Sequence, residues 1–381
     1  MQRLVHLLIY TLLACPMICA QSSNTLTPAQ RAAALEGAGQ YAEAEKAWLV
    51  VLSASPEDAA ASAHLGLVYA REGRYSEAIP AYRKALKLRP GMPGVAMDLS
   101  LALFKEGHLA EAIAPLKEAA KETPSDPRAK LLLGMCYYGT GQYAAAVPFL
   151  RAGVELSPSN LELRLALAQS CLWAAEYSCA LDEYQAILKQ DPNSAQADMI
   201  AGQALDAKGD TSGAVAQFRA AESAAPNTPD VHFGLGYLLW KQGQLPEATR
   251  EFQAELTLEP NHPLALTYLG DIAIKNNDWV TARADLQRAM AQPGASRQTV
   301  LDMAIVDAQD KQYPQAEAEF KHAISMDPAN PDAHWRLAHV LMTMGKRDEA
   351  NAELAKVRQL HESKDERLVQ QMSHPPMPAQ P

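Results

Sequence analysis

The sequence predicts an all-α protein built from about ten repeats of 34 residues, each a pair of antiparallel helices. Apolar residues make up 48% of the 381 residues and aromatic residues only 6%. The abundant Ala and Leu favour helix over strand. Gly39, Gly73, Gly107 and Gly141 lie 34 residues apart, and an alanine follows each of them five residues later. A fixed period of this length is the signature of a helical repeat array.

One position of the repeat is alanine ten times in succession, which fixes the phase of the array. These residues are Ala44, Ala78, Ala112, Ala146, Ala180, Ala214, Ala248, Ala282, Ala316 and Ala350. The glycine row continues at Gly209, Gly243 and Gly345, with Ala175, Asn277 and Lys311 at the positions between. The repeats therefore span 25–58, 59–92, 93–126, 127–160, 161–194, 195–228, 229–262, 263–296, 297–330 and 331–364.

The second repeat shows why each element is expected to form. Apolar residues between Leu65 and Tyr69 give one helix an apolar side, and Gly73 ends that helix because glycine tolerates a positive φ. The spacing of the apolar residues that follow predicts a second helix, which Pro90 ends. Gly66 is expected to face Ala78 across the pair, so that the two backbones approach closely.

These residues resemble the tetratricopeptide repeat. The resemblance rests on Leu65-Gly66, Tyr69, Gly73-Arg74-Tyr75, Glu77-Ala78, Tyr82, Ala85 and Pro90, and extends over residues 25–364. It implies a right-handed α-solenoid, a superhelix in which the first helix of each pair lines the concave face. The resemblance also implies that the fifth, ninth and twelfth places of the repeat point into that concave groove.

The two ends of the chain differ from the array. Residues 1–20, with Arg3 and an apolar run, are typical of a signal peptide cleaved after Ala20, followed by a short polar leader at 21–24. A second interpretation makes Cys15 the lipidated first residue of a lipoprotein. Residues 365–373 are expected to form a capping helix, and 374–381 a disordered Pro-rich tail. The chain thus resembles an exported bacterial member of the family.

Charge and motifs argue against several classes of function. The net charge of −10, without a long basic run, argues against nucleic-acid binding. The sequence contains no nucleophile elbow, phosphate-binding glycine loop or zinc-protease motif, so we expect no catalytic residues, cofactor or metal. A repeat-bearing transferase is the enzymatic alternative, and it would need a catalytic domain for which the repeats leave no room.

The candidate binding residues are apolar residues at the places that the resemblance directs inward. They are Met97, Leu101, Phe104, Leu131, Met135 and Tyr138 in repeats three and four, and Phe233, Tyr237 and Trp240 in repeat seven. The ninth place usually carries a polar Asn in this family, and Leu101, Met135 and Tyr237 depart from that here. An apolar groove indicates a binding site, although partial burial in the array explains part of the pattern. The Lys and Asn residues with which some members bind a C-terminal carboxylate are absent.

Three cysteines lie within the repeats. Cys171 and Cys179 stand four residues before and four after Ala175, the turn residue of their repeat. Antiparallel helices bring such symmetric residues together, so a disulfide between them is possible if their Cα atoms lie within about 7 Å. Two half-buried free thiols are the alternative, and Cys136 is expected to stay free.

The sequence therefore favours a non-enzymatic scaffold of the cell envelope or periplasm. Its partner is expected to be a protein or peptide segment held in the apolar groove, with no nucleic acid, and with contact to a membrane only through a lipid on Cys15. The alternative is an outer-membrane lipoprotein or adaptor that serves polysaccharide export, pilus assembly or secretion.

Overall fold

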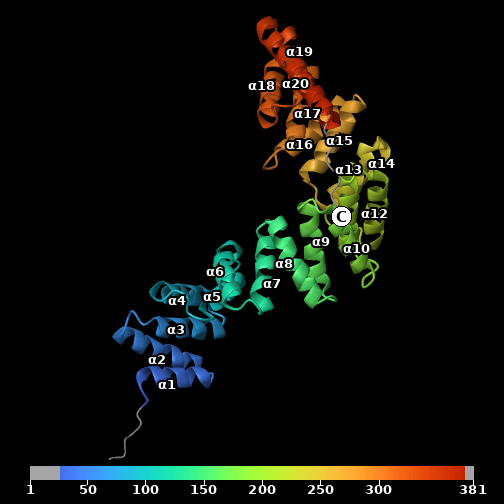
Figure 1. Ribbon diagram of the computed structural model, residues 1–381. Coiled ribbons are helices and arrows are strands. Elements are labelled where there is room, and N and C mark those ends of the chain that lie inside the picture. The colour runs from blue at the N-terminus through green and yellow to red at the C-terminus, as the bar shows by residue number, and fades with distance from the viewer. Residues whose placement is uncertain (1–25, 374–381) are drawn as a thin grey trace, which may run out of the picture. The chain divides into compact units, whose positions relative to one another are not determined.

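The computed structural model describes residues 26–373, which form twenty helices and no strand (Figure 1). The chain divides into two compact parts, Met1–Thr140 and Gly141–Pro381, here called the N-terminal and C-terminal parts. The expected signal peptide, the leader, Cys15 and the Pro-rich tail lie outside the described residues. Among the described helices, none is both long and apolar enough to cross a bilayer.

The helices follow one another along the chain, two in each repeat, as the sequence predicts. The N-terminal part contains α1 (Pro28–Gly37), α2 (Tyr41–Ala54), α3 (Ala59–Arg71), α4 (Tyr75–Leu88), α5 (Val95–Lys105), α6 (Leu109–Glu122) and α7 (Pro127–Gly139). The C-terminal part begins with α8 (Tyr143–Leu156), α9 (Leu161–Trp173), α10 (Tyr177–Leu188), α11 (Ala195–Ala207), α12 (Thr211–Ala224) and α13 (Val231–Lys241). It ends with α14 (Leu245–Leu258), α15 (Pro263–Lys275), α16 (Trp279–Met290), α17 (Arg297–Gln309), α18 (Tyr313–Met326), α19 (Pro331–Thr343) and α20 (Arg347–Ser373).

The packing confirms the all-α fold with helices in consecutive pairs. Within each part, the main contacts of a helix are with the next helix, as in α3 with α4 and α11 with α12. First helices of successive repeats also touch, as α9 touches α11 and α15 touches α17. Stability in such an array comes from contacts between neighbours, because no single pair buries its own apolar faces.

The turn within each pair uses a left-handed residue, as the glycine row predicts. Gly73 has φ +76° and directly follows the C-cap of α3, where the N–H of Arg74 reaches back to the carbonyl of Tyr69. This is the Schellman arrangement that favours glycine. The three row positions without glycine, Ala175, Asn277 and Lys311, have the same conformation, with φ between 58° and 61°. Their place in the repeat therefore overrides the steric preference of the side chain.

The alanine column is buried, and the atoms nearest to Gly66 belong to Tyr82 of the second helix. All ten column alanines are fully buried. A Cβ on Gly66 would lie 2.8 Å from the ring of Tyr82, one turn beyond Ala78. The same position meets Phe218 at Gly202, Phe252 at Gly236 and Leu286 at Gly270. The small residue thus makes room for a large ring or leucine, and at Gly202 also for the backbone carbonyl of the column alanine Ala214, 3.3 Å away.

The capping helix expected at 365–373 does not form a separate element. These residues are helical, but they continue α20, which runs unbroken for 27 residues from Arg347 to Ser373. Residues 361–373 contain neither Gly nor Pro, so the sequence offers no helix-ending signal there.

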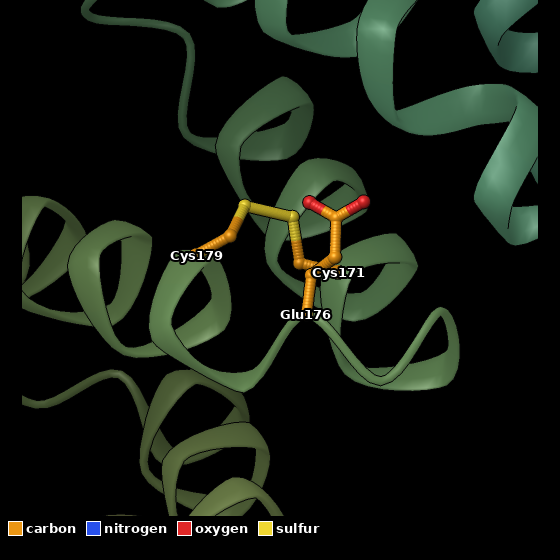
Figure 2. A group of neighbouring side chains, drawn as sticks. All are labelled: Cys171, Glu176 and Cys179. Atoms are coloured by element: carbon orange, nitrogen blue, oxygen red, sulfur yellow. A yellow bond between two sulfur atoms is a disulfide. The ribbon is translucent and has the colours of Figure 1, made fainter. Parts of the chain in front are cut away.

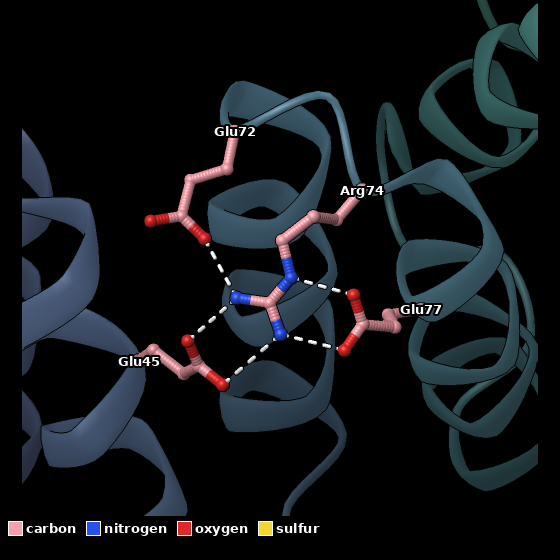
Figure 3. A network of polar contacts seen from close by, with 4 residues as sticks. All are labelled: Glu45, Glu72, Arg74 and Glu77. Atoms are coloured by element: carbon pink, nitrogen blue, oxygen red, sulfur yellow. Dashed lines mark hydrogen bonds and ion pairs between the residues drawn. The ribbon is translucent and has the colours of Figure 1, made fainter.

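A polar network ties neighbouring helices together in the N-terminal part (Figure 3). The guanidinium of Arg74 donates to Glu45 of α2 at 2.7 Å, to Glu72 at 2.8 Å and to Glu77 of α4 at 2.5 Å. It also lies 4.5 Å from the ring centroid of Tyr69. Hydrogen bonding from Arg74 lowers the pKa of Glu77 below its ordinary value. One arginine thus joins α2 to the turn and the second helix of the next repeat.

Candidate functional site

A groove of about 620 Å³ in the C-terminal part is the best candidate for a binding site. It lies along α9, α11 and α13, which are first helices of three successive repeats. Its lining residues are Gln169, Trp173, Gln196, Met199, Ile200, Gln203, Asp206, Ala207, Phe218, Thr228, Pro229, Asp230, Phe233, Gly234, Tyr237 and Leu238. A concave surface that mixes apolar side chains with a few polar groups is typical of ligand sites. We call it the α9–α13 groove.

Side chains at the ninth place form a row of polar groups along this groove. Gln169, Gln203 and Tyr237 occupy that place on α9, α11 and α13, at intervals of 34 residues. An amide side chain both donates and accepts hydrogen bonds. The groove therefore repeats a hydrogen-bonding group from one helix to the next, beside the apolar surfaces of Met199 and Phe233.

Trp173 is the most exposed large apolar residue of the groove. Its side chain is 60% exposed at the last position of α9, and its ring stacks on Tyr143 of α8 with centroids 6.1 Å apart. It occupies the thirteenth place of its repeat, one beyond those that the sequence analysis considered. The sequence feature that could have indicated Trp173 is an aromatic residue at the end of the first helix of a repeat.

The predicted residues of repeat seven divide between the groove and an aromatic cluster around Tyr268. Phe233 and Tyr237 line the α9–α13 groove, whereas Trp240 packs edge-on against Tyr268 of α15 at 4.8 Å. The indole N–H of Trp240 donates to Asp271 at 2.6 Å, and the ammonium of Lys275 lies 4.5 Å from the Trp240 ring centroid. Tyr268, which the sequence analysis missed, packs against all three residues, and burial raises its pKa to about 12.

The six predicted residues of repeats three and four are half-buried on two first helices of the N-terminal part. Met97, Leu101 and Phe104 belong to α5, and Leu131, Met135 and Tyr138 belong to α7. A hollow of about 290 Å³ beside α3 is lined by other residues, among them His64, Leu67 and Asp98. These six therefore remain a prediction for a binding surface.

A disulfide joins Cys171 of α9 to Cys179 of α10 next to the groove (Figure 2). Their Cα atoms are 5.8 Å apart, and the bridged segment contains Trp173 and the left-handed Ala175. Glu176 lies beside the bridge and accepts from Arg151 of α8 at 3.4 Å. Cys136 is free and buried, and burial raises its pKa to about 11, so its thiol stays protonated at neutral pH.

Removing this bridge is expected to lower the free energy of unfolding by about 2.5 kcal/mol, the chain-entropy value for a nine-residue loop. Urea unfolding of the wild type with and without a phosphine reductant measures the change. The Cys171→Ser/Cys179→Ser variant is the control, because the reductant should not affect it. Mass spectrometry after digestion without reductant should show the bridged peptides, and a fully alkylatable Cys179 would refute the bridge.

Comparison with known proteins matches the repeat assignment along most of the chain. Models described as tetratricopeptide repeat match residues 69–136, 103–152, 137–204 and 307–369, and also 30–93 and 233–296. A model described as TPR repeat matches residues 202–243. No curated protein matches the sequence.

Solved structures share the fold at low sequence identity. Cut9–Hcn1, a hetero-tetramer of APC/C, matches with a TM-score of 0.52 at 15% identity, over 88% of each chain. A tetratricopeptide repeat protein from Parabacteroides merdae matches with a TM-score of 0.51 at 17% identity, over 65% of this chain and 97% of that one. YrrB, described as a TPR protein with an unusual peptide-binding site, matches with a TM-score of 0.41 at 21% identity, over 48% of this chain and 94% of that one. The repeat period, the paired helices and the matched models agree, and the chain belongs to the tetratricopeptide repeat family.

Proposed function

We propose that this protein is a non-enzymatic scaffold that binds an extended segment of a partner polypeptide in the α9–α13 groove. Proteins of this repeat family are typically non-enzymatic scaffolds. The observation that carries the proposal is the row of Gln169, Gln203 and Tyr237 beside apolar side chains in one groove. Gln169 and Gln203 lie on α9 and α11, which contact each other, and Tyr237 continues the row on α13. The row therefore offers an extended chain several binding groups along its length.

The two kinds of lining group suit the two parts of a peptide. The amides of Gln169 and Gln203 can exchange hydrogen bonds with main-chain N–H and C=O groups, which every sequence contains. Trp173, Met199 and Phe233 offer apolar surface to side chains, and aromatic anchors commonly contribute most of an interface's energy. The groove is thus suited to bind a main chain generally and to select among side chains.

A peptide library tests this proposal directly. We expect a phage-displayed library of random nine-residue peptides, selected on the full chain, to yield enriched sequences that bind as synthetic peptides. Trp173→Ala should weaken their binding by about 2 kcal/mol, the usual cost of truncating an aromatic anchor. Gln203→Ala should cost about 1 kcal/mol, the net value of a hydrogen bond. Isothermal titration calorimetry measures both.

Trp335→Ala is the matched control. Trp335 is also a half-exposed tryptophan of a first helix, but it lines a separate hollow of about 380 Å³ beside α17 and α19. Its truncation should leave the affinity unchanged. A library without enriched peptides, or equal losses for Trp173→Ala and Trp335→Ala, would overturn the proposal.

We propose further that the protein acts in the cell envelope or periplasm. The signal-like segment at 1–20 supports this location, and so does the Cys171–Cys179 disulfide, because such bridges persist in oxidising compartments. The alternative, an outer-membrane lipoprotein or adaptor for polysaccharide export, pilus assembly or secretion, rests on Cys15. Mass spectrometry of the protein from membrane and periplasmic fractions distinguishes them: a terminus at Gln21 supports the first, and a lipid on Cys15 supports the second.

A further inference from the structure

Asp230, which lines the α9–α13 groove, has a left-handed backbone conformation that glycine adopts at the same place of another repeat. It is the N-cap of α13 and is left-handed, with φ 65° and ψ 0°. It does not belong to the row of turn residues that the repeat requires. Most side chains other than glycine disfavour this region, and aspartate is among the few that enter it.

The chain itself shows which residue this position accepts without strain. Gly94 precedes Asp230 by four repeats, occupies the same place, and is the N-cap of α5 with φ 79° and ψ −22°. Both caps are followed by a valine and an eleven-residue helix. The fold therefore does not need an aspartate at this position.

The carboxylate of Asp230 is also not used to cap its helix. The buried Glu255 of α14 caps α13 instead: it accepts from the N–H of Asp230 at 3.2 Å and from the N–H of Phe233 at 3.0 Å. Glu255 is only 1% exposed, whereas the side chain of Asp230 is 62% exposed. Because Glu255 caps the helix, the carboxylate of Asp230 faces solvent.

In the described part of the chain, the Asp230 carboxylate has one side-chain partner, the imidazole of His262, at 3.1 Å from Nε2. The other ring nitrogen, Nδ1, accepts from the N–H of Ala265 at 3.1 Å. The ring proton therefore lies on Nε2 and is donated to Asp230, and the imidazole is neutral. The negative charge of Asp230 is hydrogen-bonded but not balanced, and no imidazole lone pair is left for a metal ion.

The rest of the groove lining supplies no cation. Asp206 is the other acidic lining residue, and Lys241 already pairs with it at 2.8 Å. Among the described residues that line the groove, none is Lys or Arg. The rings of Phe233 and Tyr237 line the groove together with Asp230, and aromatic faces attract cations.

We infer that Asp230 binds the ammonium or guanidinium of a Lys or Arg side chain in the peptide segment that occupies the groove. This inference rests on the proposed function and specifies its partner: an extended segment with a basic residue among apolar ones. The apolar residues contact Met199 and Phe233, and the basic residue supplies the charge that Asp230 lacks. Acidic segments are excluded by repulsion from Asp230.

The test compares two charge-removing variants. Asp230→Asn keeps an oxygen that accepts from His262 and tolerates the left-handed conformation. Asp182→Asn, on the exposed face of α10, is the matched control with the same change in net charge. The probes are peptides enriched from the random library, each synthesised with its basic residue as Lys, Gln or Glu.

We expect wild-type protein to bind the Lys peptide about tenfold more tightly than the Gln peptide, and the Glu peptide more weakly still. Asp230→Asn should reduce the Lys preference to less than threefold, whereas Asp182→Asn should preserve it. Asp230→Gly should reduce the Lys preference to the same extent. It should not lower the melting temperature, because Gly94 occupies the equivalent left-handed position in its own repeat.

Two outcomes overturn the inference without affecting the proposed function. One is enrichment of peptides without basic residues, and the other is a Lys preference that survives in Asp230→Asn. Failure of the library to yield any binding peptide overturns the proposed function itself, so the two failures are distinguishable.

Discussion

Replacing Asp302 with asparagine is expected to raise the free energy of unfolding at pH 8 by an amount on the order of 3–4 kcal/mol, and to change it little at pH 4. Asp302 of α17 is 2% exposed, and burial raises its pKa to about 7. One carboxyl oxygen accepts from Gln298 at 2.8 Å, and the other has no partner within the described residues.

The sign follows from proton binding. Because the pKa is higher in the folded state than in the unfolded chain, the folded protein binds this proton more tightly. The stability that this protonated carboxyl contributes is therefore fully present below about pH 4, and that contribution is lost as the pH rises toward 7. Asparagine is neutral throughout, so it removes the cost of burying a charge at high pH.

Hydrogen exchange of residues 297–309 at several pH values, together with urea unfolding, measures this effect. A local probe is needed because repeat arrays do not always unfold in a single step. The exposed Asp182→Asn variant should show no such pH dependence. A benefit of Asp302→Asn that is equal at pH 4 and pH 8 would contradict the buried-carboxyl explanation.

Phe252→Ala is expected to destabilise the C-terminal part by about 3–5 kcal/mol, the range for truncating a buried phenylalanine. Phe252 of α14 is fully buried. Its ring stacks on Tyr268 at 5.6 Å and lies 6.0 Å from the ring of Phe233. The substitution would leave a cavity behind the α9–α13 groove and remove a contact of Phe233.

A double-mutant cycle tests whether the loss of stability in Phe252→Ala comes from the removal of the packed ring. A Cβ on Gly236 would lie 2.9 Å from the Phe252 ring, so Gly236→Ala should destabilise the wild type. In the Phe252→Ala background the ring is gone, and the same alanine should cost much less, because only the Cβ of Glu251 remains close, at 3.2 Å. Val280→Ala, at a residue that is 83% exposed, is the control and should change stability by less than about 0.5 kcal/mol. Additive effects of Gly236→Ala and Phe252→Ala would contradict this packing.

The sequence was sufficient to predict the repeat and its turns. The alanine column is buried throughout, and the phase alone placed Ala175, Asn277 and Lys311 at turns where glycine is usual. The contact of Gly66 with Tyr82 could not be predicted, because the offset between paired helices is a tertiary property. The continuity of α20 could have been predicted, since no Gly or Pro interrupts residues 361–373.

The candidate site was only partly predictable for a definable reason. Apolar residues at the fifth, ninth and twelfth places predict Phe233 and Tyr237, but they do not predict Gln169, Gln203 and Trp173. The position of Trp240 in its repeat also does not predict that its side chain packs against Tyr268 and donates to Asp271, because that orientation depends on the next repeat. The role of Asp230 depends on Glu255 and His262, which are 25 and 32 residues away.

The restriction of helix contacts to near neighbours has a mechanical consequence. A displacement at α9 can reach α17 only through the helices between them, as in a row of coupled springs. A small opening of the groove would therefore be shared among several interfaces between neighbouring helices instead of concentrated in one hinge.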